Sequence, residues 1–383
     1  MTATHPAPLR ERARHIAALA AERADKAEAA RTPDPDVMEA VTAAGFTNHF
    51  APPPYGNPQS TFLELKRAAV VIGAECPATA WCAVLAALMA RAAGHLPPEG
   101  QRRLWAKGPG TLIAGGVTPR GTAAPADGGW TLSGAWPSVT AAEHADWMLL
   151  AARVAGAAAD PVAGARVFLV PCDAVRVEKT WDDIGMRATG SHTVVVDRAF
   201  VAAPMTFPLA CFAELDDPQP GPDGRAVPLL AVNTFMFSLA MLGAARGAVR
   251  CWERLAGARI RERPAGYDPV ISHYADVFAR SSGEIDAADL LLDRVGEFID
   301  TAGAVTRADV ARNQRDCAFA ADLLVGAVDR LMRASGSGGH STGSVLQRLW
   351  RDVHTAGAHA ALQFGPAAAS YAREVLKGDD AHA

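Results

Sequence analysis

Several common features are missing from this sequence, and each absence excludes a class of protein. The six cysteines are spread over 383 residues without a C-x-x-C pair, which argues against a zinc site or a disulfide framework and indicates a reduced, intracellular protein. No stretch of about 18 apolar residues is free of charged side chains, so no membrane span is expected. The first 25 residues contain no uncharged apolar core, so no signal peptide is expected. A cytoplasmic protein is therefore predicted.

A large excess of charge of one sign is also missing. The chain has 37 Lys and Arg against 41 Asp and Glu, a formal net charge of −4, and its basic residues form no cluster. Nucleic acid and membrane surfaces are therefore not expected as partners. The sequence has neither a G-x-G-x-x-G turn after a predicted strand nor a P-loop, so the chain is not expected to bind a nicotinamide nucleotide itself.

The sequence does contain a change of residue pattern along the chain. Apolar residues at helical spacing come first, β-prone runs punctuated by glycine, proline and aspartate follow, and long helical stretches come last. This order predicts a helical domain, a β domain, a polar proline-rich connector and a second helical domain, at residues 1–110, 111–206, 207–226 and 227–383. Four long helices with short loops predict an antiparallel bundle in the last domain, at residues 235–263, 268–302, 309–334 and 345–374.

Residues 128–147 are the most informative stretch of the β domain. Asp127, Gly128 and Gly129 are a turn signal before a β-prone run, so a hairpin strand is predicted here. The segment SGAWPSVTAAEHADW, residues 133–147, resembles the central β motif of the acyl-CoA dehydrogenase family, where the flavin ring lies against it. Residues 184–191 (IGMRATGS) and 346–352 (LQRLWRD) resemble further motifs of that family. The resemblance implies a mainly α fold with an N-terminal helical domain, a central β-barrel or sandwich domain and a C-terminal four-helix bundle, assembled as a homotetramer.

The residues after Arg351 indicate a branch of this family. Many acyl-CoA dehydrogenases have a glutamate nine residues after this arginine as the base that removes the substrate α-proton, and Ala360 stands there in this chain. No Asp or Glu occurs between Asp352 and Glu374, whereas His359 occupies the preceding position. That pattern resembles the group D flavin-dependent monooxygenases, the oxygenase components of two-component systems. The resemblance implies that His359 is catalytic, and an imidazole titrates where it can handle a proton of the substrate or of the oxygen chemistry.

The same resemblance implies a set of binding residues and no metal. It places the hydroxyls of Ser138 and Thr140 at the flavin ring. The backbone amides of Val117 and Thr118 would bind its pyrimidine edge. The cofactor of a neighbouring subunit would be contacted by Gly336 and Ser337, together with Arg261 or Arg263. The pocket walls would be Trp81 and Trp136, although either could instead be a core residue.

The sequence departs from the family patterns at several places. Ser138 stands where the family usually has an aromatic residue. Near Met89 or Ala90, many group D members carry a second active-site histidine, and His95 lies nearby but on another face of the expected helix. The missing histidine indicates an altered substrate or reaction.

The resemblance implies a monooxygenase that uses reduced flavin, FMNH2 or FADH2, and O2. It would hydroxylate carbon or nitrogen of a small aromatic, polyketide-type or amino-sugar metabolite. A separate NAD(P)H:flavin reductase would supply the flavin by diffusion. One alternative is an acyl-CoA dehydrogenase-like flavin oxidase or desaturase, with Glu253 as a weak candidate base. A second alternative is a non-catalytic assembly protein that retains the fold.

Overall fold

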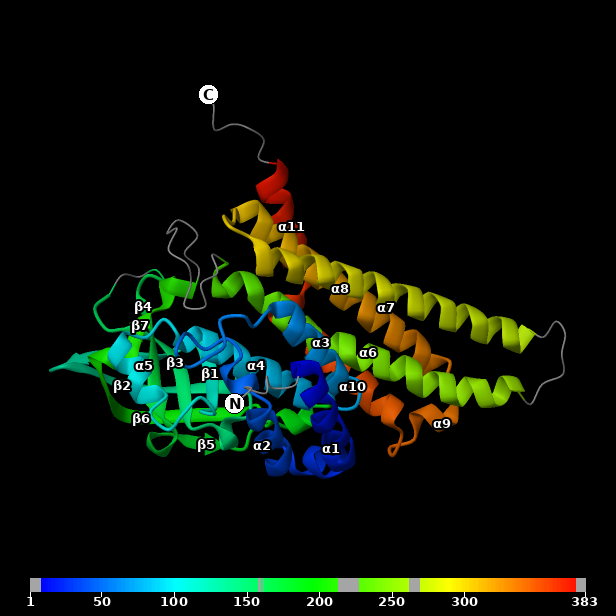
Figure 1. Ribbon diagram of the computed structural model, residues 1–383, viewed down its shortest axis with the longest axis horizontal. Coiled ribbons are helices and arrows are strands. Elements are labelled where there is room, and N and C mark those ends of the chain that lie inside the picture. The colour runs from blue at the N-terminus through cyan, green and yellow to red at the C-terminus, as the bar shows by residue number, and fades with distance from the viewer. Residues whose placement is uncertain (1–7, 158–159, 161, 213–226, 262–268, 377–383) are drawn as a thin grey trace, which may run out of the picture.

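The computed structural model describes residues 8–157, 160, 162–212, 227–261 and 269–376 (Figure 1). The N-terminal part is helical, as predicted. Its first two helices are joined by a short turn in which the Asp34 carboxylate caps the second helix and Pro35 occupies the first turn. The helices of this part are α1 (Leu9–Ala30), α2 (Pro35–Ala43), α3 (Phe62–Gly73), α4 (Pro77–Ala93) and α5 (Pro98–Leu104).

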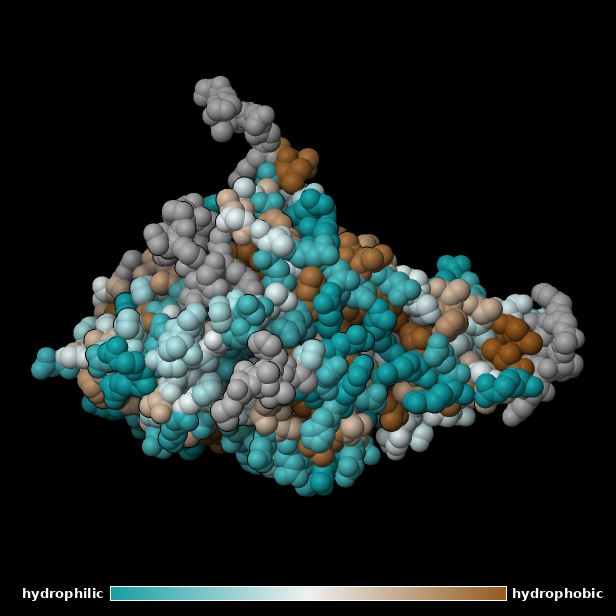
Figure 2. All heavy atoms as spheres, in the orientation of Figure 1, coloured by the Kyte–Doolittle hydropathy of each residue, from teal (hydrophilic) through white to brown (hydrophobic). Residues whose placement is uncertain are grey.

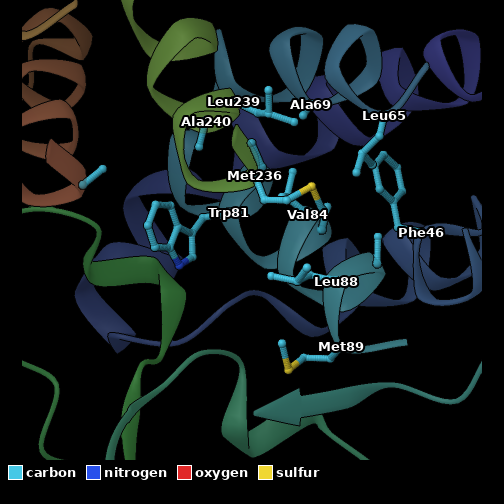
Figure 3. Packing of buried hydrophobic residues seen from close by; sticks show 14 of the residues in the cluster. Phe46, Leu65, Ala69, Trp81, Val84, Leu88, Met89, Met236, Leu239 and Ala240 are labelled. Atoms are coloured by element: carbon cyan, nitrogen blue, oxygen red, sulfur yellow. The ribbon is translucent and has the colours of Figure 1, made fainter. Parts of the chain in front are cut away.

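Helix α4 lies at the centre of the molecule because it is apolar on all sides. Every residue of α4 except Leu85 is buried, as expected for a helix without a polar face. It packs against α3 and α6 on one side and against the first strand on the other. Figure 3 shows Trp81, Val84 and Leu88 of α4 beside Met236 of α6.

The β part is one mixed sheet of seven strands in the order β5-β6-β2-β1-β3-β4-β7. Its β1–β2 hairpin turns at Asp127 and Gly128, within the predicted turn signal, with Ala126 paired to Gly129 and Gly128 at φ +71°. The β1–β3 pair is parallel and the other neighbours are antiparallel. The strands are β1 (Ile113–Ala126), β2 (Gly129–Val139), β3 (Trp147–Val154), β4 (Ala165–Pro171), β5 (Arg176–Glu178), β6 (His192–Ala202) and β7 (Thr206–Pro208).

The C-terminal part consists of long helices that project away from the sheet (Figure 1). They are α6 (Leu229–Arg261), α7 (Pro269–Thr301), α8 (Arg307–Arg333), the short α9 (Ser337–His340), α10 (Val345–Gly357) and α11 (Phe364–Leu376). One stretch of α6, Ala231–Ala258, is long and apolar enough to cross a membrane, but 78% of its most apolar window is buried inside the protein. Most of the predicted connector, residues 213–226, lies outside the described residues.

The helix predicted at 345–374 is in fact interrupted, and that prediction was wrong. Helix α10 ends at Gly357, and His359 adopts an extended backbone before the 3₁₀ turn Ala360–Leu362. The His359 side chain caps this turn by accepting from the Ala361 amide. Pro366, which is tolerated only in the first turn of a helix, fits the start of α11 at Phe364. His359 therefore lies in a break between two helices rather than on a helix face.

Candidate functional site

A cavity of about 570 Å³ opens where the sheet, α4, α6 and the end of α10 meet. Its size is that of a small-molecule or cofactor site. One side is formed by β1, β2 and the 3₁₀ turn Arg187–Thr189 (η4), and the other by α4, α6 and the break after α10. Seven predicted site residues line this cavity: Trp81, Val117, Thr118, Trp136, Ser138, Thr140 and His359.

The end of β2 bends toward the cavity. Its pairing with β6 loses register between Trp136 and Val139, and Ser138 and Ala141 have left-handed φ angles of 60° and 54°. Such a bulge redirects side chains, and both Ser138 and Thr140 line the cavity. The non-aromatic residue at position 138 therefore belongs to a strained bend.

Trp136 is mainly a core residue, although its edge also reaches the cavity. Its side chain is 1% exposed and its Nε1 donates to the Ala151 carbonyl at 2.7 Å. The indole occupies space left by Gly116, Gly121 and Gly134. A Cβ on Gly121 would lie 2.3 Å from the indole.

Backbone amides on β1 are available beside the cavity. Pairing of β1 with β3 breaks between Gly116 and Gly121, and pairing of β1 with β2 begins only at Thr122. The amides of Val117 and Thr118 therefore take no part in either ladder. A strand stretch without register partners next to a cavity fits the polar rim of a flavin pyrimidine ring, for which the resemblance had implied these amides.

Three buried hydroxyls form a row on the same side. Thr140 Oγ1 lies 2.9 Å from Ser191 Oγ, which lies 2.7 Å from Thr189 Oγ1. Thr189 in turn donates to the carbonyl of Met186 at 2.9 Å. All four residues line the cavity. Thr189 and Ser191 were missed as site residues because only the fold brings the motif at 184–191 against Thr140.

The opposite wall is aromatic. The indole of Trp81 stacks on Phe237 at 5.0 Å between ring centroids, and the imidazole of His359 lies 4.1 Å from Phe237 and 5.9 Å from Trp81. Because His359 Nδ1 accepts the Ala361 amide hydrogen at 3.2 Å, the neutral ring carries its own hydrogen on Nε2. Phe237 was also missed by sequence reasoning, since nothing local connects it to residues 81 and 359.

Burial lowers the pKa of His359 below its usual value. The folded protein therefore favours the neutral ring, so His359 stabilises the fold above pH 6.5 and this contribution is lost as pH falls through the lowered pKa. We expect kcat to fall on the acid side with an apparent pKa below about 6.5. A pH–rate profile checks this, and an acid limb centred above pH 7 would contradict it.

Fixed charge is confined to the rim of the cavity. Among its described lining residues, Arg120 and Asp183 are the ionised side chains, and both are exposed. The inner part has leucines, Met89 and the aromatic wall, with Asn233 Oδ1 and Thr355 Oγ1 buried there without a hydrogen-bond partner. Figure 3 shows Met89 pointing toward the strand below α4, where a Cβ on Gly115 would lie 2.1 Å from its sulfur.

Met89 thus lies on the cavity wall near the position where many group D members have a histidine. Its thioether replaces an ionisable ring with an apolar group. His95 does not line this cavity and packs against Phe207 and Phe212 instead. Among the cavity-lining residues that the structure describes, His359 is therefore the sole imidazole.

Other predicted residues lie elsewhere. Arg261 is exposed at the end of α6, and Gly336 and Ser337 lie at the start of α9. None of these three lines the cavity. Arg263 falls outside the described residues. Glu253 is exposed on α6 and is also absent from the cavity lining.

Comparison with known proteins identifies relatives of the chain. Residues 235–364 match the family described as acyl-CoA dehydrogenase, C-terminal domain. The chain is 30% identical to a pigment production hydroxylase of a Rhodococcus species, over 96% of both chains. It is 28% identical to the FADH(2)-dependent resorcinol hydroxylase, oxygenase component, of a Rhizobium species, over 91% of this chain and 89% of the relative.

Solved structures show the same fold. The 3-HSA hydroxylase of a Rhodococcus species superposes with a TM-score of 0.88 at 25% identity, covering 98% of this chain and 97% of that one. XiaF from a Streptomyces species, in complex with FADH2 and glycerol, superposes with a TM-score of 0.85 at 27% identity, covering 97% and 95%. These likenesses extend over nearly the whole chain.

Proposed function

We propose a role for each part of the cavity on the following premise. The chain belongs to the group D flavin-dependent monooxygenases of the acyl-CoA dehydrogenase fold, and it is the oxygenase component of a two-component system. It is an oxidoreductase that uses reduced flavin and O2, and it works with a separate reductase component and a small-molecule substrate. Bound reduced flavin supplies the electrons that activate O2.

The flavin ring lies against the sheet side of the cavity in this proposal. Ser138 and Thr140 offer hydroxyls there, and the amides of Val117 and Thr118 lie outside the strand ladders. The donor set fits the polar edge of a flavin, whereas α4 and α6 present apolar surface to its face. Arg261, Gly336 and Ser337 lie outside this cavity, so any role at a cofactor requires a neighbouring subunit.

The substrate is proposed to be a neutral aromatic molecule held between the flavin and the helices. The observation that carries this proposal is the packing of His359 on Phe237 and Trp81 in a cavity whose inner wall has no fixed charge. Flat aromatic walls suit a phenol, an indole or an aromatic polyketide better than a cationic amino sugar. The neutral imidazole of His359 carries its hydrogen on Nε2, so Nε2 would donate to the oxygen of a substrate hydroxyl.

The acyl-CoA dehydrogenase-like alternative is not favoured by the site. Ala360 lines the cavity where the family base would stand, and Asp183 is the one carboxylate among the described lining residues. Asp183 is exposed at the rim, so it is poorly placed to be the desolvated base that α-proton removal requires.

A homotetramer in the cytoplasm, receiving flavin by diffusion from an NAD(P)H:flavin reductase, completes the proposal. The bundle carries large apolar side chains that a single chain leaves exposed, including Phe278 and Leu290 on α7 and Phe319 on α8. Figure 2 shows hydrophobic surface among polar residues over the projecting helices. Exposed apolar surface of this kind supports association of subunits through the bundle.

Substrate charge provides the test of the proposed substrate class. We expect kcat/KM for a neutral phenol such as resorcinol to exceed that for the anionic p-hydroxyphenylacetate by at least about 10²-fold, because an unpaired carboxylate is costly to bury. The measurement compares initial rates of product formation with both compounds. Arg120→Gln serves as the control, since loss of the rim cation should leave the ratio high. Equal efficiency toward both compounds would contradict the proposal.

A further inference from the structure

The row of hydroxyls at Thr140, Ser191 and Thr189 has a fixed direction. Each hydroxyl has one hydrogen to donate, and the row ends at the carbonyl oxygen of Met186, which has none. Thr189 gives its hydrogen to that carbonyl, so Ser191 must give its hydrogen to Thr189, and Thr140 must give its hydrogen to Ser191. The Thr140 oxygen is then left with lone pairs only.

The end of the row at Met186 is held firmly. The Met186 amide donates to the buried carboxylate of Asp352 on α10 at 2.5 Å, and the indole Nε1 of Trp181 donates to the Met186 carbonyl at 3.0 Å. Neighbouring Gly185 packs so closely on α10 that a Cβ there would lie 2.2 Å from the Arg351 carbonyl oxygen. The bundle thus fixes the acceptor that orders the row.

The row is also shielded from solvent. Thr140, Thr189 and Ser191 are 9%, 1% and 5% exposed. Water therefore cannot readily supply a substitute partner and reverse the direction. A buried hydroxyl that faces the wrong partner leaves a polar group unsatisfied, which is costly.

A hydroxyl oxygen that can accept a hydrogen bond but not donate one distinguishes the two redox states of a flavin. On two-electron reduction, N5 of the ring changes from an acceptor with a lone pair to a donor that carries hydrogen. The carbonyl oxygens remain acceptors and N3 remains a donor in both states. An acceptor-only oxygen at N5 therefore pairs with reduced flavin and opposes the lone pair of oxidised flavin.

We propose that Ser191 and Thr189 are positioning residues that hold Thr140 as an obligate acceptor, and that this row makes the site select reduced over oxidised flavin. The inference rests on the proposed placement of flavin against Thr140, and it adds that the Thr140 hydroxyl faces N5 of the ring. Selection of this kind lets the protein capture flavin from a reductase and release it once oxidised. The direction of the row, rather than the presence of Thr140 alone, carries the selectivity.

The test measures the dissociation constants of reduced and oxidised flavin separately, with FMN and with FAD, reduced forms being titrated anaerobically. Ser191→Ala frees the Thr140 hydrogen to turn toward the flavin, so the ratio of the oxidised to the reduced dissociation constant should fall roughly tenfold, as expected for one hydrogen bond. The midpoint potential of bound flavin should fall by about 30 mV, the equivalent of tenfold for two electrons. Thr189→Val should act in the same direction.

Two matched variants separate a specific effect from general damage. Ser191→Thr keeps the hydroxyl and should retain the wild-type ratio. Thr206→Val removes a buried hydroxyl, 1% exposed, that donates to the Val167 carbonyl in the same sheet and does not line the cavity. This variant should also retain the ratio.

The outcomes distinguish the inference from the function on which it rests. If wild-type protein binds neither flavin state, the placement of flavin fails, and with it the proposed site. If flavin binds but Ser191→Ala changes both dissociation constants equally or leaves the ratio unchanged, the inference about the row is overturned while the proposed function stands.

Discussion

Replacing His359 with alanine is expected to lower kcat for hydroxylation by about 10²- to 10⁴-fold, the usual contribution of a positioned acid or base. The imidazole packs on Phe237 and Trp81 in the cavity, and its Nδ1 is occupied by the Ala361 amide. Nε2 is therefore the atom available to a substrate hydroxyl. Product formation with excess reduced flavin and O2 measures the effect.

The control for this variant is His354→Ala. His354 lies on α10 only five residues earlier, but it does not line the cavity and contacts Asp329 at 3.8 Å. Flavin dissociation constants and the assembly state should be unchanged in both variants, because neither ring lies among the flavin-side residues. Wild-type turnover in His359→Ala would show that the proposed role of this histidine is wrong.

The second large effect is expected on stability. Trp136→Ala should lower the free energy of unfolding by about 3–5 kcal/mol, the usual cost of emptying an aromatic core site. The indole is 1% exposed and fills space that three glycines leave in the sheet. The remaining cavity cannot easily collapse, because the sheet backbone around those glycines is fixed by its ladders. The shift in the urea midpoint measures the loss.

Trp136→Phe separates packing from hydrogen bonding in the same site. Phenylalanine keeps most of the ring but leaves the Ala151 carbonyl without the Nε1 donor, at an expected cost of about 1–3 kcal/mol. Its midpoint should therefore lie between those of the wild type and the alanine variant. An alanine variant as stable as wild type would mean that Trp136 is a pocket wall and not part of the core.

The fold and one residue on each side of the cavity, Thr140 and His359, could be predicted from the sequence. The motif at residues 133–147 has fixed spacings, so Thr140 could be predicted as a site residue, and it lines the cavity. His359 was found by its distance from Arg351. The interruption at Gly357 was missed because alanines on both sides continue the helical pattern and hide the break.

The parts that could not be predicted depend on contacts between distant segments. Thr140 and Ser191 are 51 positions apart and meet only because β2 and β6 are neighbours in the sheet. Phe237 contacts both Trp81 and His359 because α6 packs against α4 of the N-terminal part and against α10. No periodicity or local motif encodes these contacts, because they arise from tertiary packing.

The proposed function is tested most directly by giving the purified protein chemically reduced FMN or FAD, oxygen-18 gas and a set of neutral phenols and indoles, without any reductase. We expect a hydroxylated product that carries one oxygen-18 atom, with no requirement for a nicotinamide nucleotide. Tight binding of oxidised FAD that an acyl-CoA thioester bleaches, with no oxygen-18 in any aromatic product, would contradict it.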